Sequence, residues 1–135
     1  MSLTFPQAQT VISVAHDHAR REGLRVAVAV VDEGGLLQAL GRMDGAFPLS
    51  SQIAEAKAVG AALWHRDGGD LAAVQNERGA FFAAVGQLTR LPIIPGAGSV
   101  VVRDGDTVLG AIGVSGATSE KDLECAEAGL TALRR

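Results

Sequence analysis

Residues 107–122 read Thr-Val-Leu-Gly-Ala-Ile-Gly-Val-Ser-Gly-Ala-Thr-Ser-Glu-Lys-Asp, an apolar strand punctuated by glycines that runs into a helix. Apolar residues on both alternations predict a strand that is buried on both faces and therefore central in its sheet. Glycine adds no side chain to a strand, so Gly113 and Gly116 indicate that a bulge, a helix or a ligand approaches the backbone closely. Thr118 or Ser119 is expected to cap this helix, as Thr4 is expected to cap the first helix and Ser50 or Ser51 the helix that ends at His65. The strand end, the glycine turn and the free helix amides together predict a concave corner that favours an anion.

The composition predicts one globular domain, residues 1–135, with 47% hydrophobic and 20% charged residues. The formal net charge is -3 and the basic residues are scattered, so nucleic acid is not an expected partner. No apolar run reaches the ~20 residues that span a bilayer, and the N-terminus does not look like a signal peptide. We therefore expect no membrane partner and a cytoplasmic location. The single cysteine, Cys125, excludes an internal disulfide and a thiolate metal cluster within one chain.

The remaining pattern predicts an α+β domain in the order helix, hairpin, helices, hairpin, helix. The expected helices are 4–23, 50–65, 71–76, 79–88 and 119–133, and the expected hairpins are 26–43 and 99–115. The segment 91–99 carries two prolines and two glycines, so it is expected to be a shaped loop that packs on the core or on another subunit. Two hairpins predict a four- to five-stranded antiparallel sheet flanked by helices.

Two basic residues and one acid are candidates for a polar site. Arg42 and Asp44 project the same way from the end of a predicted strand, which suits a surface ion pair or an anion-binding arginine, and spacing alone favours the pair. Lys57 lies on an otherwise apolar helix stripe. It is expected to extend to the edge, to pair with a carboxylate such as Asp44, or to line a polar pocket, and the first two are favoured together.

Two histidines lie at the margins of the apolar stripe of the first helix. His18 is slightly nearer the centre of the stripe than His16, and a half-exposed imidazole is the expected state of each taken singly. They are two residues apart and diverge on a helix, so no set of His, Cys, Asp and Glu has metal-site spacing in the sequence. A bound metal is therefore expected inside a cofactor. Gly110 to Gly116 also fails as a dinucleotide motif, because the glycine spacing and the following βαβ unit are both missing.

Four blocks together resemble the GlcG/HbpS-type haem-binding family, which is itself similar to the C-terminal domain of the PduO corrinoid adenosyltransferase. The blocks are Val30–Leu36, Arg42–Ala46, Ala54–Ala58, and Leu109–Gly116 followed by Asp122 and Ala126–Leu130. The resemblance covers nearly the whole chain in order. It implies a profilin-like α/β/α sandwich, assembly into dimers or larger rings, and haem as the candidate cofactor. Family members commonly carry a Gly-Gly-x-Pro block before the second hairpin, where this chain has Pro-Gly-Ala-Gly-Ser at 95–99.

The resemblance does not map an iron ligand onto one residue of this sequence, so the residues expected at a ligand follow from the patterns described above. The residues expected at a ligand with carboxylates are Arg42, Lys57, Gly96, Gly98, Gly113, Ser115 and Gly116. His18 is the expected iron ligand and His16 the second candidate, because a neutral imidazole is the commonest protein ligand for haem iron.

Three functions remain open at this point. The first is a haem- or tetrapyrrole-binding protein. The second is a small-molecule enzyme in which Lys57 or Asp44 acts as a general acid or base on an organic acid or aromatic catabolite. The third is a homo-oligomeric interaction protein without a ligand, which the mean hydropathy of +0.22 favours. The sequence does not name a substrate or fix the number of subunits.

Overall fold

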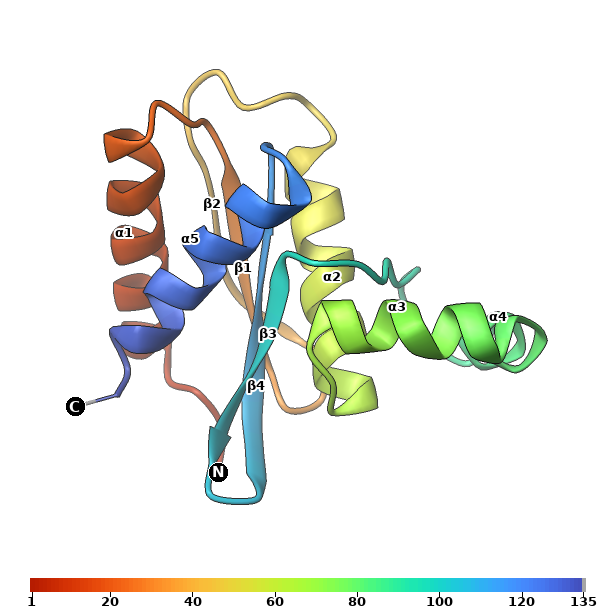
Figure 1. Ribbon diagram of the computed structural model, residues 1–135. Helices are drawn as coiled ribbons and strands as arrows, with labels where there is room; N and C mark the ends of the chain where they lie inside the picture. Colours follow the sequence, from red (N-terminus) through yellow and green to blue (C-terminus); the bar gives the residue numbers. More distant parts are fainter. Residues whose placement is uncertain (135) are drawn as a thin grey trace.

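The computed structural model describes residues 1–134 and contains the predicted order of elements. Helices α1, α2 and α5 and four strands make the body, and α3 and α4 extend from it (Figure 1). The helices are α1 (Phe5–Arg21), α2 (Ser50–Trp64), α3 (Gly68–Glu77), α4 (Gly79–Gly86) and α5 (Ser119–Thr131). The strands are β1 (Ala27–Asp32), β2 (Leu37–Arg42), β3 (Ser99–Asp104) and β4 (Thr107–Ser115).

The strands form one antiparallel sheet in the order β2-β1-β4-β3. β4 pairs with β1 on one side, with Ala27 opposite Ser115, and with β3 on the other. The glycine-punctuated strand is therefore an inner strand, as its continuous apolar character predicts. The sheet has four strands, the lower of the two numbers expected, because each hairpin supplies two.

Helices cover both faces of the sheet and give an α/β/α sandwich. α1 and α5 pack on one face, and α2 packs on the other (Figure 1). Alternate residues of β1 divide between the two layers: Val28 and Val30 join the core under α1 and α5, while Ala29 and Val31 join the core under α2. The period of two along the strand therefore separates the cores, and small side chains on the α2 side let that helix approach closely.

The glycines of β4 and of the turn after it serve the packing of the chain itself. A Cβ atom on Gly113 would collide with the carbonyl oxygen of Ala54 on α2, and one on Gly116 would collide with the carbonyl oxygen of Arg25. A bulge, a helix or a ligand was expected near these glycines, and at Gly113 the close approach is that of helix α2. Close approach of the chain entering β1 accounts for Gly116.

The helix starts agree with the capping signals in two cases and differ in one. Thr4 makes a capping box with Gln7, and Thr118 accepts a hydrogen bond from the Lys121 N–H, so each is the cap that its sequence indicates. At α2 the cap position is Leu49, with no side-chain bond, and the Ser50 N–H donates to the Phe47 carbonyl. The chain thus enters α2 through a backbone turn, which replaces the expected serine cap.

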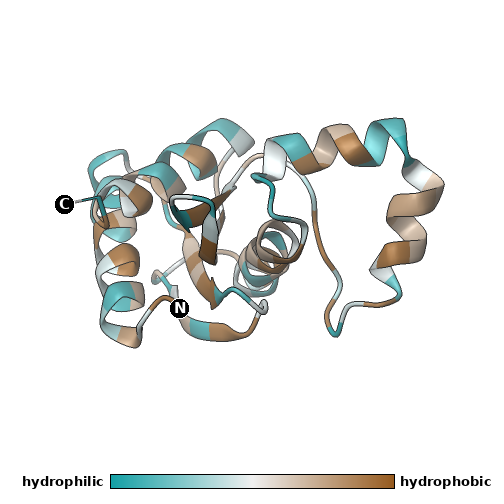
Figure 2. Ribbon diagram, turned by 90° about the horizontal axis from the view of Figure 1, so that it is seen from below, coloured by the Kyte–Doolittle hydropathy of each residue, from teal (hydrophilic) through white to brown (hydrophobic). Residues whose placement is uncertain are grey.

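Helices α3 and α4 and the loop after them form an arm beside α2, in which hydrophobic residues recur (Figure 2). Trp64 at the end of α2 holds the arm by stacking on Phe82, with ring centroids 5.3 Å apart, and by an edge contact with Phe81. The loop carries Ile93 against the core under α2, as expected of an apolar residue in a shaped loop. Within residues 1–134, none of the helices combines the length and apolarity needed to cross a membrane.

Candidate functional site

Lys57 lies in the body of α2 and is buried, with 8% of its surface exposed. Its Nζ donates to the Val114 carbonyl oxygen at 2.9 Å and to Asp122 Oδ2 at 3.2 Å. Asp122 comes from the first turn of α5, and its Oδ1 accepts the Ala117 N–H at 2.9 Å. The lysine therefore ties α2 to the end of β4 and to the start of α5 through one buried ion pair.

Burial of the Lys57–Asp122 ion pair disfavours the charged form of Asp122. Burial raises the pKa of Asp122, and the Lys57 ammonium and the Ala117 N–H oppose that rise without cancelling it. Both side chains are more than nine-tenths buried, so water contributes little to their solvation. An ion pair in this setting fixes geometry between elements more than it adds stability.

The ammonium group of Lys57 lies beside the glycine-lined segments at the end of β4 and before β3, where protein groups already bind it. A Cβ atom on Gly98 would lie 2.7 Å from Lys57 Nζ, so that glycine leaves room for the ammonium group. Ser115 is paired with Ala27 of β1 and is buried, with 4% of its surface exposed. The Gly96 N–H donates to the Gly68 carbonyl oxygen at 2.9 Å. The carboxylate that pairs with Lys57 is Asp122, where the sequence suggested Asp44. Asp122 was noted in the sequence as part of a family-like block, and nothing local in the sequence links it to a lysine 65 positions earlier.

Arg42 and Asp44 lie elsewhere, at an open cavity of about 480 Å³ between the end of α1, the start of β1 and the end of β2. We call this cavity the arginine pocket. Its lining residues are His16, Arg20, Gly23, Leu24, Arg25, Arg42, Met43 and Asp44. Lys57 is not among them, so the structure does not place the two candidate acid–base residues, Lys57 and Asp44, at one cavity.

Each of the three arginines of the pocket already makes a polar contact within the protein. Arg42 Nη1 donates to the Ala46 carbonyl oxygen and Arg25 Nη1 to the Asp44 carbonyl oxygen, each at 3.0 Å. Each guanidinium has five N–H groups, so each keeps donors for a further acceptor. Arg20 pairs with Asp17 at 2.7 Å on the exposed side of α1. Three cationic side chains thus line a cavity with one carboxylate on its wall, which favours an anionic ligand.

Sequence reasoning missed Arg20 and Arg25. A signal for Arg20 was present, since it lies four residues after His16 and hence on the same helix face. Arg25 had no such signal. Its position becomes meaningful only when β2 pairs with β1 and brings Arg42 opposite Ala27.

The two histidines point to different surroundings. His16 lines the arginine pocket, and its Nε2 lies 3.0 Å from the Gly41 carbonyl oxygen. A carbonyl only accepts, so Nε2 carries the proton and Nδ1 keeps a free lone pair. His18 instead faces α5, with Nε2 3.6 Å from Glu124 Oε1. The histidine beside the candidate anion site is therefore the second of the two that the sequence offered.

A separate groove of about 400 Å³ runs between α2 and the loop that follows α4. Its lining is mostly apolar, and no cation or histidine contributes to it. The lining residues are Leu49, Gln52, Ile53, Glu55, Ala56, Leu91, Pro92 and Ile94. Glu55 at its wall would repel carboxylates, so this groove suits an apolar partner better than an anion.

The model of a family described as "Haem degrading protein HbpS-like" matches residues 3–131. The chain therefore belongs to the HbpS-like family. Protein GlcG of Escherichia coli strain K12 is 39% identical to it over 114 residues, which cover 84% of this chain and 81% of GlcG. The resemblance that the four sequence blocks carried is confirmed.

Solved structures agree with the fold. A double mutant of HbpS from Streptomyces reticuli matches this HbpS-like chain with a TM-score of 0.89 at 30% identity, covering 98% of this chain and 88% of the other. A PduOC–haem complex matches with a TM-score of 0.87 at 23% identity, covering 98% of this chain and 96% of the other. At that identity the second match bears on the fold alone. The expected α+β class is confirmed by these neighbours together with the four-stranded antiparallel sheet.

Proposed function

We propose that this chain binds haem or a related tetrapyrrole, with the ligand carboxylates in the arginine pocket and the ring beside His16. The observation that carries the proposal is the convergence of Arg20, Arg25 and Arg42 on a cavity that also holds an imidazole. The description of the family as haem-degrading supports it, as does the haem complex of PduOC, although that ligand is a property of the other protein.

The residues of the pocket fit the carboxylate end of a haem. Haem carries two propionates, and an arginine fork matches a carboxylate with two parallel hydrogen bonds. Arg25 and Arg42 keep free N–H groups after bracing the loop that follows β2. A charge-assisted hydrogen bond contributes about 1.5–3 kcal/mol, so two arginines suffice to hold and orient a dianion.

His16 is the proposed iron ligand because it lines the pocket and because Nδ1 retains a lone pair while Nε2 donates to Gly41. Leu24 and Met43 supply apolar surface next to it. His18, the first choice from the sequence, remains the alternative ligand, and the experiment separates the two. Bound haem would supply an iron centre able to take ligands or electrons, and the role of this chain is to hold that centre and shape access to it.

The test is titration of the purified protein with haemin, followed by the haem absorption band. The wild-type protein should show a sharp, shifted band that saturates at a fixed ratio of haem to chain. His16→Ala should abolish the shift, and Arg42→Ala should weaken binding by about 10- to 100-fold, equivalent to the 1.5–3 kcal/mol of one charge-assisted bond. His65→Asn is the matched control, because His65 lies at the far end of α2 in a left-handed conformation that asparagine tolerates.

Two results would contradict the proposal. Weak, non-saturating binding by the wild-type protein would indicate adsorption to an apolar surface. A shifted haem band that is lost in His18→Ala and kept in His16→Ala would show that the iron binds on the other side of α1.

Assembly into at least a dimer and a cytoplasmic location are part of the same proposal. Exposed Phe47, Leu49 and Leu88 lie near the apolar groove or on the arm, where a second copy would cover them. Analytical ultracentrifugation tests the assembly, and a single monomeric species at micromolar concentration would contradict it. Fractionation of cells that produce the protein tests the location.

A further inference from the structure

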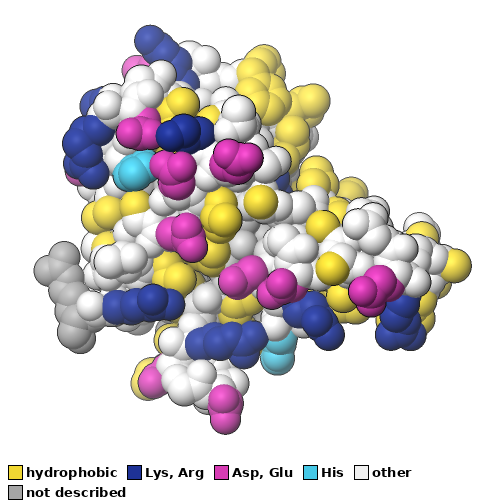
Figure 3. Space-filling model, in the orientation of Figure 1, with side chains coloured by type: hydrophobic (Ala, Val, Ile, Leu, Met, Phe, Trp, Pro, Cys, Tyr) yellow, Lys and Arg dark blue, Asp and Glu magenta, His cyan; other side chains and the backbone are white. Residues whose placement is uncertain are grey.

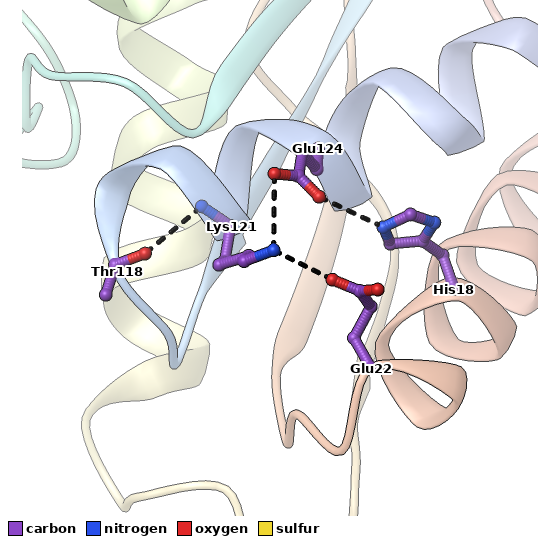
Figure 4. Close-up of polar contacts among 5 residues, drawn as sticks. All are labelled: His18, Glu22, Thr118, Lys121 and Glu124. Atoms are coloured by element: carbon purple, nitrogen blue, oxygen red, sulfur yellow. Dashed lines mark hydrogen bonds and ion pairs between the residues drawn. The ribbon is translucent and has the colours of Figure 1, made fainter.

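A second cluster of polar side chains lies on the other side of α1, where that helix meets α5 (Figure 4). His18 lies in the last turn of α1, and Glu22, four positions later, is the residue that caps the C-terminus of this helix. α5 packs against α1 and contributes Glu124. Figure 3 shows acidic, basic and histidine side chains gathered on the surface over these helices.

The three side chains lie close enough together for one metal ion to contact all of them. One ligand atom from each, the imidazole nitrogen of His18 and a carboxylate oxygen of Glu22 and of Glu124, lies within 4.8 Å of the other two. Around a tetrahedral ion with bonds near 2.1 Å, ligand atoms are roughly 3.4 Å apart. The His18–Glu124 separation of 3.6 Å already has this value.

The imidazole of His18 has an unused coordination site. Its Nε2 is shielded from solvent and makes no hydrogen bond within residues 1–134, and its polar contact is the one with Glu124 Oε1 at 3.6 Å, longer than a hydrogen bond. A shielded polar nitrogen without a hydrogen bond costs free energy, so such an atom in a native structure calls for an explanation. Here the nitrogen points at two carboxylates, as Figure 4 shows, which is the arrangement that a bound cation would satisfy.

In the structure the positive charge beside these two carboxylates comes from Lys121. Its Nζ lies 2.9 Å from Glu22 Oε1 and 3.5 Å from Glu124 Oε2, and its own backbone N–H is held by Thr118. The Lys121 hydrogen bond lowers the pKa of Glu22, and the Glu22 hydrogen bond raises the pKa of Lys121. The ammonium group leaves one carboxylate charge of the pair uncompensated. The side chain is 43% exposed, so it is free to swing into water when a stronger cation arrives.

We propose that His18, Glu22 and Glu124 form a binding site for a divalent transition-metal ion of the Zn²⁺ class, with Lys121 as the displaceable counter-ion. One imidazole and two carboxylates are the mixed nitrogen and oxygen ligands that such ions accept, whereas Mg²⁺ and Ca²⁺ prefer oxygen alone. Three protein ligands leave a fourth position for water or an incoming ligand. The site lies apart from the arginine pocket, because residues two apart on a helix point in nearly opposite directions.

The experiment is isothermal titration calorimetry of the full chain with Zn²⁺ alone, in the absence of haem. The wild-type protein should bind one Zn²⁺ per chain. His18→Ala should weaken binding by more than the roughly 10- to 100-fold that loss of an outer-shell partner costs. Lys121→Met should tighten binding by about fivefold, because the ion no longer has to displace the exposed ion pairs of Lys121 with Glu22 and Glu124, which contribute up to about 1 kcal/mol. His65→Asn, which removes a histidine far from the cluster, should match the wild type.

Three outcomes would overturn the assignment. These are the absence of saturable Zn²⁺ binding by the wild type, equal affinity in His18→Ala and His65→Asn, or no tightening in Lys121→Met. Glu124→Gln replaces His18→Ala if the latter does not fold, because Glu124 is 44% exposed and its amide is nearly isosteric. The result does not depend on the haem proposal, since a zinc isotherm is read without haem and His16 is intact in every variant.

Discussion

Substitution of Lys57 by methionine tests whether this residue is a structural cation, as its contacts indicate. The change keeps the length and apolar stem of the side chain and removes two hydrogen bonds, to Val114 O and to Asp122 Oδ2. Asp122 is then left as a buried carboxylate whose other hydrogen bond is the one from the Ala117 N–H. Removal of one partner from a buried pair costs about 3–5 kcal/mol of the free energy of unfolding. At roughly 4 °C per kcal/mol for a chain of this size, Tm should fall by about 12–20 °C.

A double variant separates the loss of the pair from the loss of packing. In Lys57→Met with Asp122→Asn, the amide oxygen still accepts the Ala117 N–H but no charge is buried. The double variant should therefore be more stable than Lys57→Met alone, by about 2 kcal/mol. Asp17→Asn breaks the exposed pair with Arg20 and serves as the matched control, with an expected cost below about 1 kcal/mol.

The pH dependence of the stability of Lys57→Met gives an independent test of the same ion pair. Burial already raises the pKa of Asp122, and loss of Lys57 removes the charge that opposes this rise. The folded state of Lys57→Met then binds a proton more tightly than the unfolded chain does. The stability that Lys57→Met loses relative to the wild type should be smallest below the ordinary pKa of 3.8 and should grow as pH rises through the raised pKa of Asp122.

The assay for all these variants is urea unfolding followed by circular dichroism, at pH 7 and at a series of lower pH values. A free energy of unfolding for Lys57→Met within about 1 kcal/mol of the wild-type value would refute the reasoning. So would a double variant less stable than the single one.

The remaining predictions concern packing and reactivity. Gly113→Ala should cost about 3 kcal/mol, because a Cβ there meets the backbone of α2, while Gly86→Ala, with open space around it, should be neutral or stabilising by up to about 1 kcal/mol in the same urea assay. Equal midpoints for these two variants would show that α2 does not approach β4 as described. Burial raises the pKa of the Cys125 thiol to about 11, so a thiol reagent at pH 8 should label it only after denaturant is added. Rapid labelling of the native protein would contradict its burial.

Local signals predicted most of the fold. The glycine-punctuated β4, the two hairpins and the caps at Thr4 and Thr118 each depend on residues a few positions apart, and each appears in the structure. The start of α3 was placed three residues late, because Gly68 and Gly69 look like a helix break but lie inside its first turn. Glycine is costly in a helix interior and tolerated at its start, where backbone N–H groups are free in any case.

The site was less predictable because its contacts join distant residues. The sequence singled out Lys57 as an odd cation, but its partner Asp122 becomes visible only when α2 and α5 meet at the end of β4. In the same way Arg42 was a candidate, whereas Arg25 joins it only through strand pairing. The role of each cation thus depends on register and layer order, which no single stretch encodes.

The most direct test of the account is an anomalous difference map at the iron absorption edge, from crystals of the protein grown with haem. One iron peak per site is expected within coordination distance of a ring nitrogen of His16, with electron density for the propionates against Arg42 and Arg25. An iron peak in the apolar groove beside α2, at His18, or at no defined position would contradict it.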